Sequence, residues 1–303
     1  MVHRALTLVS LLSLAVAGLT AASQDQRVTF RSSLDLVSIA VVVRDGGGRL
    51  VSNLNANDFE IVEGNTRRSI EHFQAGRDGD ARLALLVDSS GSMVVGARPE
   101  RARLAADMLL AGMRPADTAS VFSFDSEVRR LTPYTSDTGL LRNAVSKVVP
   151  YGTTCLFDAI ADTAQAVQAD TPRARAVVLL TDGIDTASAS TGEDAAATAT
   201  RFDLPVYVIG VGSLSDPPEM HQSRRPTQAP FSLSELARRT GGFSADATSP
   251  AQLSIATRTI LDELHQQYLL AFQGGTQPGW HQLQVKVRRG RVNARSRDGY
   301  FVH

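Results

Sequence analysis

The middle of the chain alternates short, continuously apolar runs with segments of helical periodicity. The apolar runs predict buried strands at Leu83–Val87, Ser120–Phe124, Ala176–Leu180 and Pro205–Val211. The intervening segments predict helices near Pro99–Met113, Asp137–Val149, Cys155–Ala169 and Asp194–Phe202. Strands that are apolar throughout are typical of sheets buried on both faces. We therefore expect an α/β domain with a central, mostly parallel sheet flanked by helices on both faces.

Two further helices are indicated by their N-terminal residues. Ser232, with Glu235 three residues later, predicts a capping box at the start of a helix over Leu233–Thr240. Ser249 and Pro250 occupy the N-cap and first helical positions of a helix that we expect to run through Glu263.

The two ends of the chain carry strand patterns instead. Upstream, strands are expected over Leu34–Val43 and in a hairpin formed by 59–65 and 69–73; downstream, they are expected at Tyr268–Phe272, Leu283–Val287 and Val292–Arg295. Each end is too short for a good core of its own. We expect the ends to pair into one small β-sandwich-like module with the α/β domain inserted between them, and the alternative is two separate small units. The expected boundaries are 24–78, 79–265 and 266–303.

The first 23 residues have the pattern of a secretory signal peptide. His3 and Arg4 precede an apolar run, Ala5–Leu19, which ends in small residues. The alternative is a membrane anchor, but the run is shorter than the roughly 20 apolar residues that span a bilayer. We expect an exported protein, periplasmic or extracellular, with no stable membrane insertion after cleavage. A single cysteine, Cys155, excludes an intrachain disulfide framework.

Charge argues against a nucleic-acid partner. The chain has 31 basic and 31 acidic residues, so no global field attracts nucleic acid or an anionic membrane. Basic residues do gather in the last strands, where we expect a solvated face or ion pairs with acidic residues elsewhere; the alternative is a surface that binds nucleic acid or an anionic glycan.

Polar side chains follow two of the predicted strands. Asp88, Ser90 and Ser92 alternate directly after the first strand, and Asp182 follows the third. Ligands of open α/β sheets bind outside the carboxyl ends of the strands. Gly152-Thr153-Thr154 is a further source of oxygen atoms, ahead of a helix. Two carboxylates and several hydroxyls make an oxygen-only site, which suits one Mg²⁺, Mn²⁺ or Ca²⁺ ion and disfavours zinc.

These segments resemble the von Willebrand factor A domain family. The resemblance rests on Asp88-x-Ser90-x-Ser92 after an apolar strand, Gly-Thr-Thr before a helix, and Leu179-Leu180-Thr181-Asp182-Gly183, in the same order over the whole α/β part. The flanking segments are also similar to bacterial proteins related to this family, of the type common in acidobacteria. The resemblance implies a central, mainly parallel sheet with a metal-ion-dependent adhesion site at its top.

The resemblance also implies roles for single residues. Ser90 and Ser92 would bind the metal directly, Thr154 would contribute its hydroxyl, and Asp88 and Asp182 would bind directly or through water. The family pattern Gly-Gly-Thr aligns with Gly152-Thr153-Thr154, so this chain has a threonine in place of the second glycine. In the family, the remaining metal position accepts an acidic residue of a partner protein.

We therefore expect an exported, non-enzymatic protein-binding module of the adhesion type, whose partner offers an Asp or Glu to the metal. One alternative is a structural subunit of an envelope complex with a vestigial metal site. A metal-dependent hydrolase is a weaker alternative, because no general acid or base can be placed beside Asp88 and Asp182 from sequence. The proline-containing segment 213–231 follows a strand and is expected to be either disordered or a partner-contacting loop.

Overall fold

The computed structural model describes residues 36–76, 80–167, 174–212 and 231–302. The expected signal peptide and all but the last residue of the expected loop at 213–231 lie outside the described residues. The elements described below lie within one compact unit, Asp35–His303.

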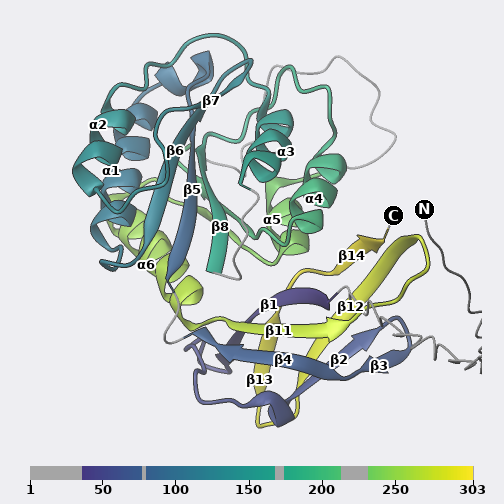
Figure 1. Ribbon diagram of the computed structural model, residues 1–303. Coiled ribbons are helices and arrows are strands. Elements are labelled where there is room, and N and C mark those ends of the chain that lie inside the picture. Colours follow the sequence, from purple (N-terminus) through teal and green to yellow (C-terminus); the bar gives the residue numbers. More distant parts are fainter. Residues whose placement is uncertain (1–35, 77–79, 168–173, 213–230, 303) are drawn as a thin grey trace, which may run out of the picture. The chain divides into compact units, whose positions relative to one another are not determined.

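A six-stranded sheet forms the centre of the α/β part within the described residues (Figure 1). Its order is β10 (Ser244–Asp246), β9 (Val206–Gly210), β8 (Ala174–Thr181), β5 (Ala81–Asp88), β6 (Thr118–Phe124) and β7 (Val128–Arg130). All neighbouring pairs are parallel except β6 with β7. The central position of β5, between β8 and β6, brings the carboxyl ends of β5 and β8 together.

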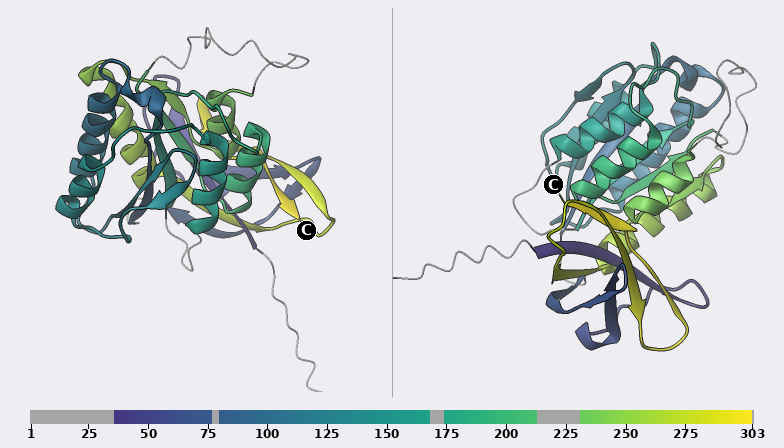
Figure 2. Two further views of the ribbon diagram at one scale, coloured as in Figure 1. Left: turned by 90° about the horizontal axis from the view of Figure 1, so that it is seen from above. Right: turned by 90° about the vertical axis from the view of Figure 1, so that its right-hand side faces the viewer.

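Helices cover both faces of this sheet (Figure 2). One face packs against α1 (Arg98–Ala111), α2 (Thr138–Ser146) and α6 (Pro250–Gln266), and the other against α3 (Leu156–Ala166), α4 (Gly192–Arg201) and α5 (Leu233–Thr240). Along β5, Leu83 and Leu85 belong to the first core and Ala84 and Leu86 to the second. Successive side chains of a strand point to opposite faces, so an apolar strand contributes to two cores. The predicted α/β fold is confirmed.

Two four-stranded antiparallel sheets form the remaining part of the described fold. One has the order β13 (Val292–Arg295), β1 (Leu36–Asp45), β11 (Tyr268–Gln273) and β4 (Ile70–Ala75); the other has the order β14 (Gly299–Val302), β12 (Gly279–Val287), β2 (Phe59–Glu63) and β3 (Thr66–Arg68). We call these two sheets the β-module. A separate apolar core includes Ile39, Ile61, Tyr268 and Phe272. Both sheets mix strands from the two ends of the chain, as the predicted β-sandwich-like module requires.

The local predictions differ from the structure in several places. The expected second arm of the hairpin, 69–73, lies in β4, which pairs with β11 in the other sheet, and the short strand β3 pairs with β2 instead. At α5, Ser232 accepts a hydrogen bond from the Glu235 amide, but the Glu235 carboxylate binds arginines instead of closing a capping box. A complete capping box lies at α6, between Ser249 and Gln252. The sequence pattern also does not predict the short strands β7, β10 and β14.

Among the residues that the structure describes, no helix has the length and apolar character needed to cross a bilayer.

Candidate metal site

Asp88 lies at the carboxyl end of β5, beside the end of β8. Its side chain is buried, with the residue only 1% exposed. One carboxylate oxygen accepts a hydrogen bond from the Thr181 hydroxyl at 2.6 Å, and the other accepts one from the Ser90 amide at 2.9 Å. These two bonds fix the Asp88 carboxylate between the two strand ends.

A short 3-10 turn, Gly91–Val94, places the two serines of the motif next to each other. The hydroxyl oxygens of Ser90 and Ser92 are 3.0 Å apart. The Gly91 amide donates to the Gly152 carbonyl at 3.0 Å. A Cβ atom at Gly91 would lie 3.0 Å from that carbonyl oxygen, so glycine permits this close approach.

Thr154 is buried on the loop that approaches Gly91. Its amide donates to the Thr186 hydroxyl at 2.9 Å, and its carbonyl accepts hydrogen bonds from the amides of Thr186 and Ala187. The segment after β8 therefore holds the Thr154 loop. Thr154 is joined to the other predicted residues through the Gly152–Gly91 contact.

Burial disfavours the charged form of Asp88. Burial is the main reason why the pKa of this carboxyl is raised to about 6, and the nearby Asp182 acts in the same direction. The hydrogen bonds from Ser90 and Thr181 lower the pKa and offset part of this rise. Within the described residues, no arginine or lysine forms an ion pair with Asp88. A cation bound here would supply the missing compensation for a desolvated carboxylate.

Asp182 has a different environment, because its carboxylate forms an ion pair with Arg98. Its Oδ2 atom lies 2.7 Å from Nη1 of Arg98, and its side chain is fully buried. The same Arg98 nitrogen donates to the Ser92 carbonyl at 2.9 Å. Arg98 thus joins the two strand-end segments that carry the predicted ligands.

The set of donor atoms suits a hard divalent cation. Carboxylate and hydroxyl oxygens are the ligands that Mg²⁺ and Ca²⁺ prefer. Among the described residues, no group of three or more His, Cys, Asp or Glu side chains is arranged to hold a metal, so any site here depends on hydroxyls as well as carboxylates. The predicted residues are compatible with one such ion.

The sequence alone does not predict the roles of two residues at the candidate site, Thr181 and Arg98. Thr181 belongs to a predicted motif, but only the structure shows that its hydroxyl anchors Asp88. Arg98 carries no sequence signal, because a lone arginine at a helix start does not point to a carboxylate 84 positions away. Only the strand order, which places β5 next to β8, brings these residues together.

Exposed apolar side chains adjoin the site. Val94 and Val95 follow the Ser92 position closely and are 62% and 59% exposed, and Tyr151, whose amide donates to the Ser89 carbonyl, is 80% exposed. We call Val94, Val95 and Tyr151 the apolar rim.

Residues 83–184 match the family model described as von Willebrand factor type A domain. No curated protein matches the chain. Similar solved structures include an aerotolerance-related membrane protein from Bacteroides fragilis carrying multiple mutations to serines (21% identity, 61% of this chain and 98% of that chain, TM-score 0.49). Another is a von Willebrand factor type A protein from Catenulispora acidiphila (12% identity, 80% of this chain and 76% of that chain, TM-score 0.48).

The matched segment begins in β5 and ends just after Asp182, so it contains every residue of the candidate site. The chain therefore contains a von Willebrand factor type A domain.

Proposed function

We propose that the protein is an exported, non-enzymatic binding module that uses one divalent cation to hold an acidic side chain of a partner protein. Asp88, Ser90, Ser92, Thr154 and Asp182 are the proposed ligands, directly or through water. The observation that carries the proposal is the buried Asp88 carboxylate, which lacks a cationic partner among the described residues and lies beside the neighbouring hydroxyls of Ser90 and Ser92.

The charges of the proposed site favour an anionic ligand. Two protein carboxylates neutralise a divalent ion, and Arg98 already offsets part of the charge of Asp182. A bound Mg²⁺, Mn²⁺ or Ca²⁺ ion would therefore attract an incoming carboxylate. The protein side chains position that ion and hold the loops in place.

The apolar rim supports a protein partner. Exposed apolar side chains close to a polar centre are typical of interaction surfaces. Val94, Val95 and Tyr151 would bury apolar area around an acidic contact.

A structural subunit with a vestigial metal site is the second candidate. The Arg98–Asp182 ion pair favours it, because Arg98 occupies an oxygen that a metal would otherwise use. Metal binding distinguishes the two candidates.

The test uses Mn²⁺, whose bound water molecules accelerate the relaxation of solvent protons. We expect the binding of Mn²⁺ to the protein to enhance the relaxation rate of the solvent protons. A short Asp-containing peptide should lower that rate, because its carboxylate replaces water bound to the ion. The matched peptide with Asn in place of Asp should have no effect. Absence of Mn²⁺ binding contradicts the proposal, and so does equal displacement by the two peptides.

A further inference from the structure

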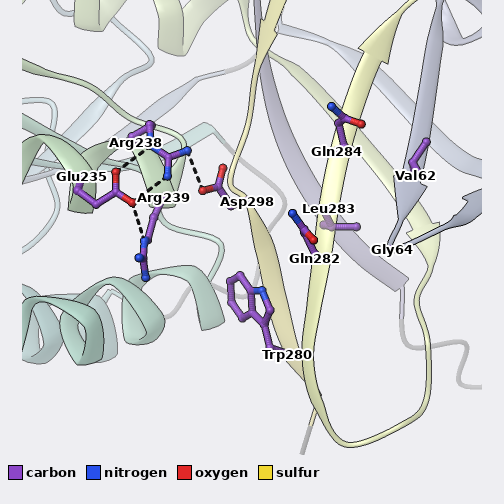
Figure 3. Close-up of a pocket in the computed structure, with 10 residues that line it drawn as sticks. All are labelled: Val62, Gly64, Glu235, Arg238, Arg239, Trp280, Gln282, Leu283, Gln284 and Asp298. Atoms are coloured by element: carbon purple, nitrogen blue, oxygen red, sulfur yellow. Dashed lines mark hydrogen bonds and ion pairs between the residues drawn. The ribbon is translucent and has the colours of Figure 1, made fainter. Parts of the chain in front are cut away.

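We infer that the groove between α5 and β12 is a second binding site, which takes a neutral oligosaccharide. The groove has a volume of about 680 Å³ and lies between two walls. Figure 3 shows Glu235, Arg238 and Arg239 of α5 on one wall, and Trp280 and Gln282 of β12 on the other.

Trp280 provides an aromatic platform. It is 47% exposed although it is a large apolar residue. A Cβ atom at Gly299 would lie 2.5 Å from Cζ2 of the indole, so the ring is seated against the glycine backbone. The indole is thereby held in place while nearly half of the residue stays open to solvent. An exposed, fixed aromatic face can stack on the apolar C–H face of a sugar ring.

Two glutamines extend the platform along the same strand. Trp280, Gln282 and Gln284 alternate with less exposed residues, so their side chains project from one face of β12. Within the described residues, neither glutamine amide makes a hydrogen bond to the protein. A free amide offers two donors and one acceptor oxygen, the combination that pairs with the hydroxyls of a sugar.

The charges on the opposite wall are already paired. Arg238 and Arg239 both bind Glu235, at 2.8 and 2.9 Å, and Arg238 also binds Asp298 at 2.9 Å. The hydrogen bonds from Arg238 and Arg239 lower the pKa of Glu235 to about 2, so this cluster stays ionised at neutral pH. Arg239 also pairs with Glu193 of α4 at 3.4 Å, outside the groove lining. The charged residues that line the groove are two positive and two negative, so the lining has no net charge. A charged ligand would have to break these pairs, whereas a polyhydroxyl ligand can bond to their remaining donors and acceptors.

The test uses the intrinsic fluorescence of Trp280, the only tryptophan of the chain. Neutral oligosaccharides of at least four rings, derived from glucan, xylan, mannan and chitin, are titrated into the protein. We expect at least one to change the fluorescence, with the affinity confirmed by calorimetry. Binding should persist in EDTA, which separates this site from the proposed metal site.

Variants locate the bound sugar. By calorimetry, Trp280→Ala should weaken binding about tenfold, as expected for loss of one aromatic contact. Gln282→Ala and Gln284→Ala should each weaken it by about threefold to tenfold. Lys286→Ala is the matched control, because Lys286 is exposed on the same strand but does not line the groove.

Several results would overturn the inference. One is no binding of any of these oligosaccharides at millimolar concentration. Another is equal binding by Trp280→Ala and the unaltered protein. Protection of the indole from acrylamide quenching would also contradict it, since a covered platform means that the chain or a second copy fills the groove.

Discussion

The guanidinium of Arg98 lies 2.7 Å from the Asp182 carboxylate, and the same nitrogen donates to the Ser92 carbonyl. The positively charged Arg98 side chain therefore contacts both segments that carry the proposed metal ligands. The Arg98 side chain is 24% exposed, whereas the Asp182 side chain is fully buried. The pair stabilises the site without a metal and opposes the approach of a second cation.

Replacing Arg98 should separate these two effects. We expect Arg98→Gln to lower the free energy of unfolding of the metal-free protein by about 1–3 kcal/mol, because Asp182 loses its charged partner. The same change should tighten divalent metal binding by about tenfold, because it removes a nearby positive charge. Calorimetric titration with Mn²⁺ measures the second effect. Arg101→Gln is the control, since Arg101 bonds to the Val211 carbonyl rather than to a carboxylate. Unchanged or weaker metal binding in Arg98→Gln would disprove the competition.

Glu263 joins α6 to the β-module. Its side chain is 1% exposed and forms ion pairs with Arg44 of β1 and Arg295 of β13. Glu263→Gln should lower the free energy of unfolding by about 3 kcal/mol, because two arginines lose a buried charge partner. Urea unfolding measures this loss. Asp262→Asn, at the exposed neighbouring position, should change stability by less than about 0.5 kcal/mol. Equal effects of the two variants would contradict the role of Glu263.

The β-module should respond to pH through Glu63 and His281. Burial raises the pKa of Glu63, but hydrogen bonds from Tyr300, His281 and Arg68 outweigh it and hold the pKa below its ordinary value of 4.5. The pKa of His281 lies above its ordinary value of 6.5, first because of its bond to the Gln277 carbonyl and also because of Glu63. The Glu63 contribution is complete above pH 4.5 and is lost as pH falls through the lowered pKa. The His281 contribution is complete below pH 6.5 and is lost as pH rises through the raised pKa.

We therefore expect these two groups to stabilise the module most between those pH values. Thermal unfolding followed by Trp280 fluorescence, repeated across pH, measures this. His281→Gln should abolish the decline on the alkaline side, whereas His72→Gln, at an exposed position, should leave it intact. A decline that persists in His281→Gln would assign it to another group.

The fold is predictable from sequence where the pattern is repeated and local. Continuous apolar strands such as Leu83–Val87 can be buried on both faces only between two layers of helices, so the α/β architecture follows directly. The separation of 69–73 from its expected hairpin does not follow, because the pairing of β4 with β11 joins strands from opposite ends of the chain.

The candidate site is predictable in part. The alternation of Asp88, Ser90 and Ser92 points to one side of a strand end, and their contacts in the structure match that spacing. The Arg98–Asp182 pair and the Thr181–Asp88 bond depend on strand order, which single-sequence periodicity does not specify. Gln282 and Gln284 have the pattern of an ordinary solvated strand face, and only the position of α5 opposite them makes them part of a groove.

Thermal unfolding tests the proposed metal site most directly. The midpoint of thermal unfolding is measured in EDTA and in Mg²⁺, Mn²⁺ or Ca²⁺, for the unaltered protein, Asp88→Ala and Ser92→Ala. Ser92→Ala removes only a hydroxyl, so its loss of metal binding would not be explained by misfolding. A ligand that binds only the folded state adds about 2.7 kcal/mol at one hundred times its Kd. We expect at least one ion to raise the midpoint of the unaltered protein and neither variant to show the full rise. No shift at millimolar metal would contradict a working metal site.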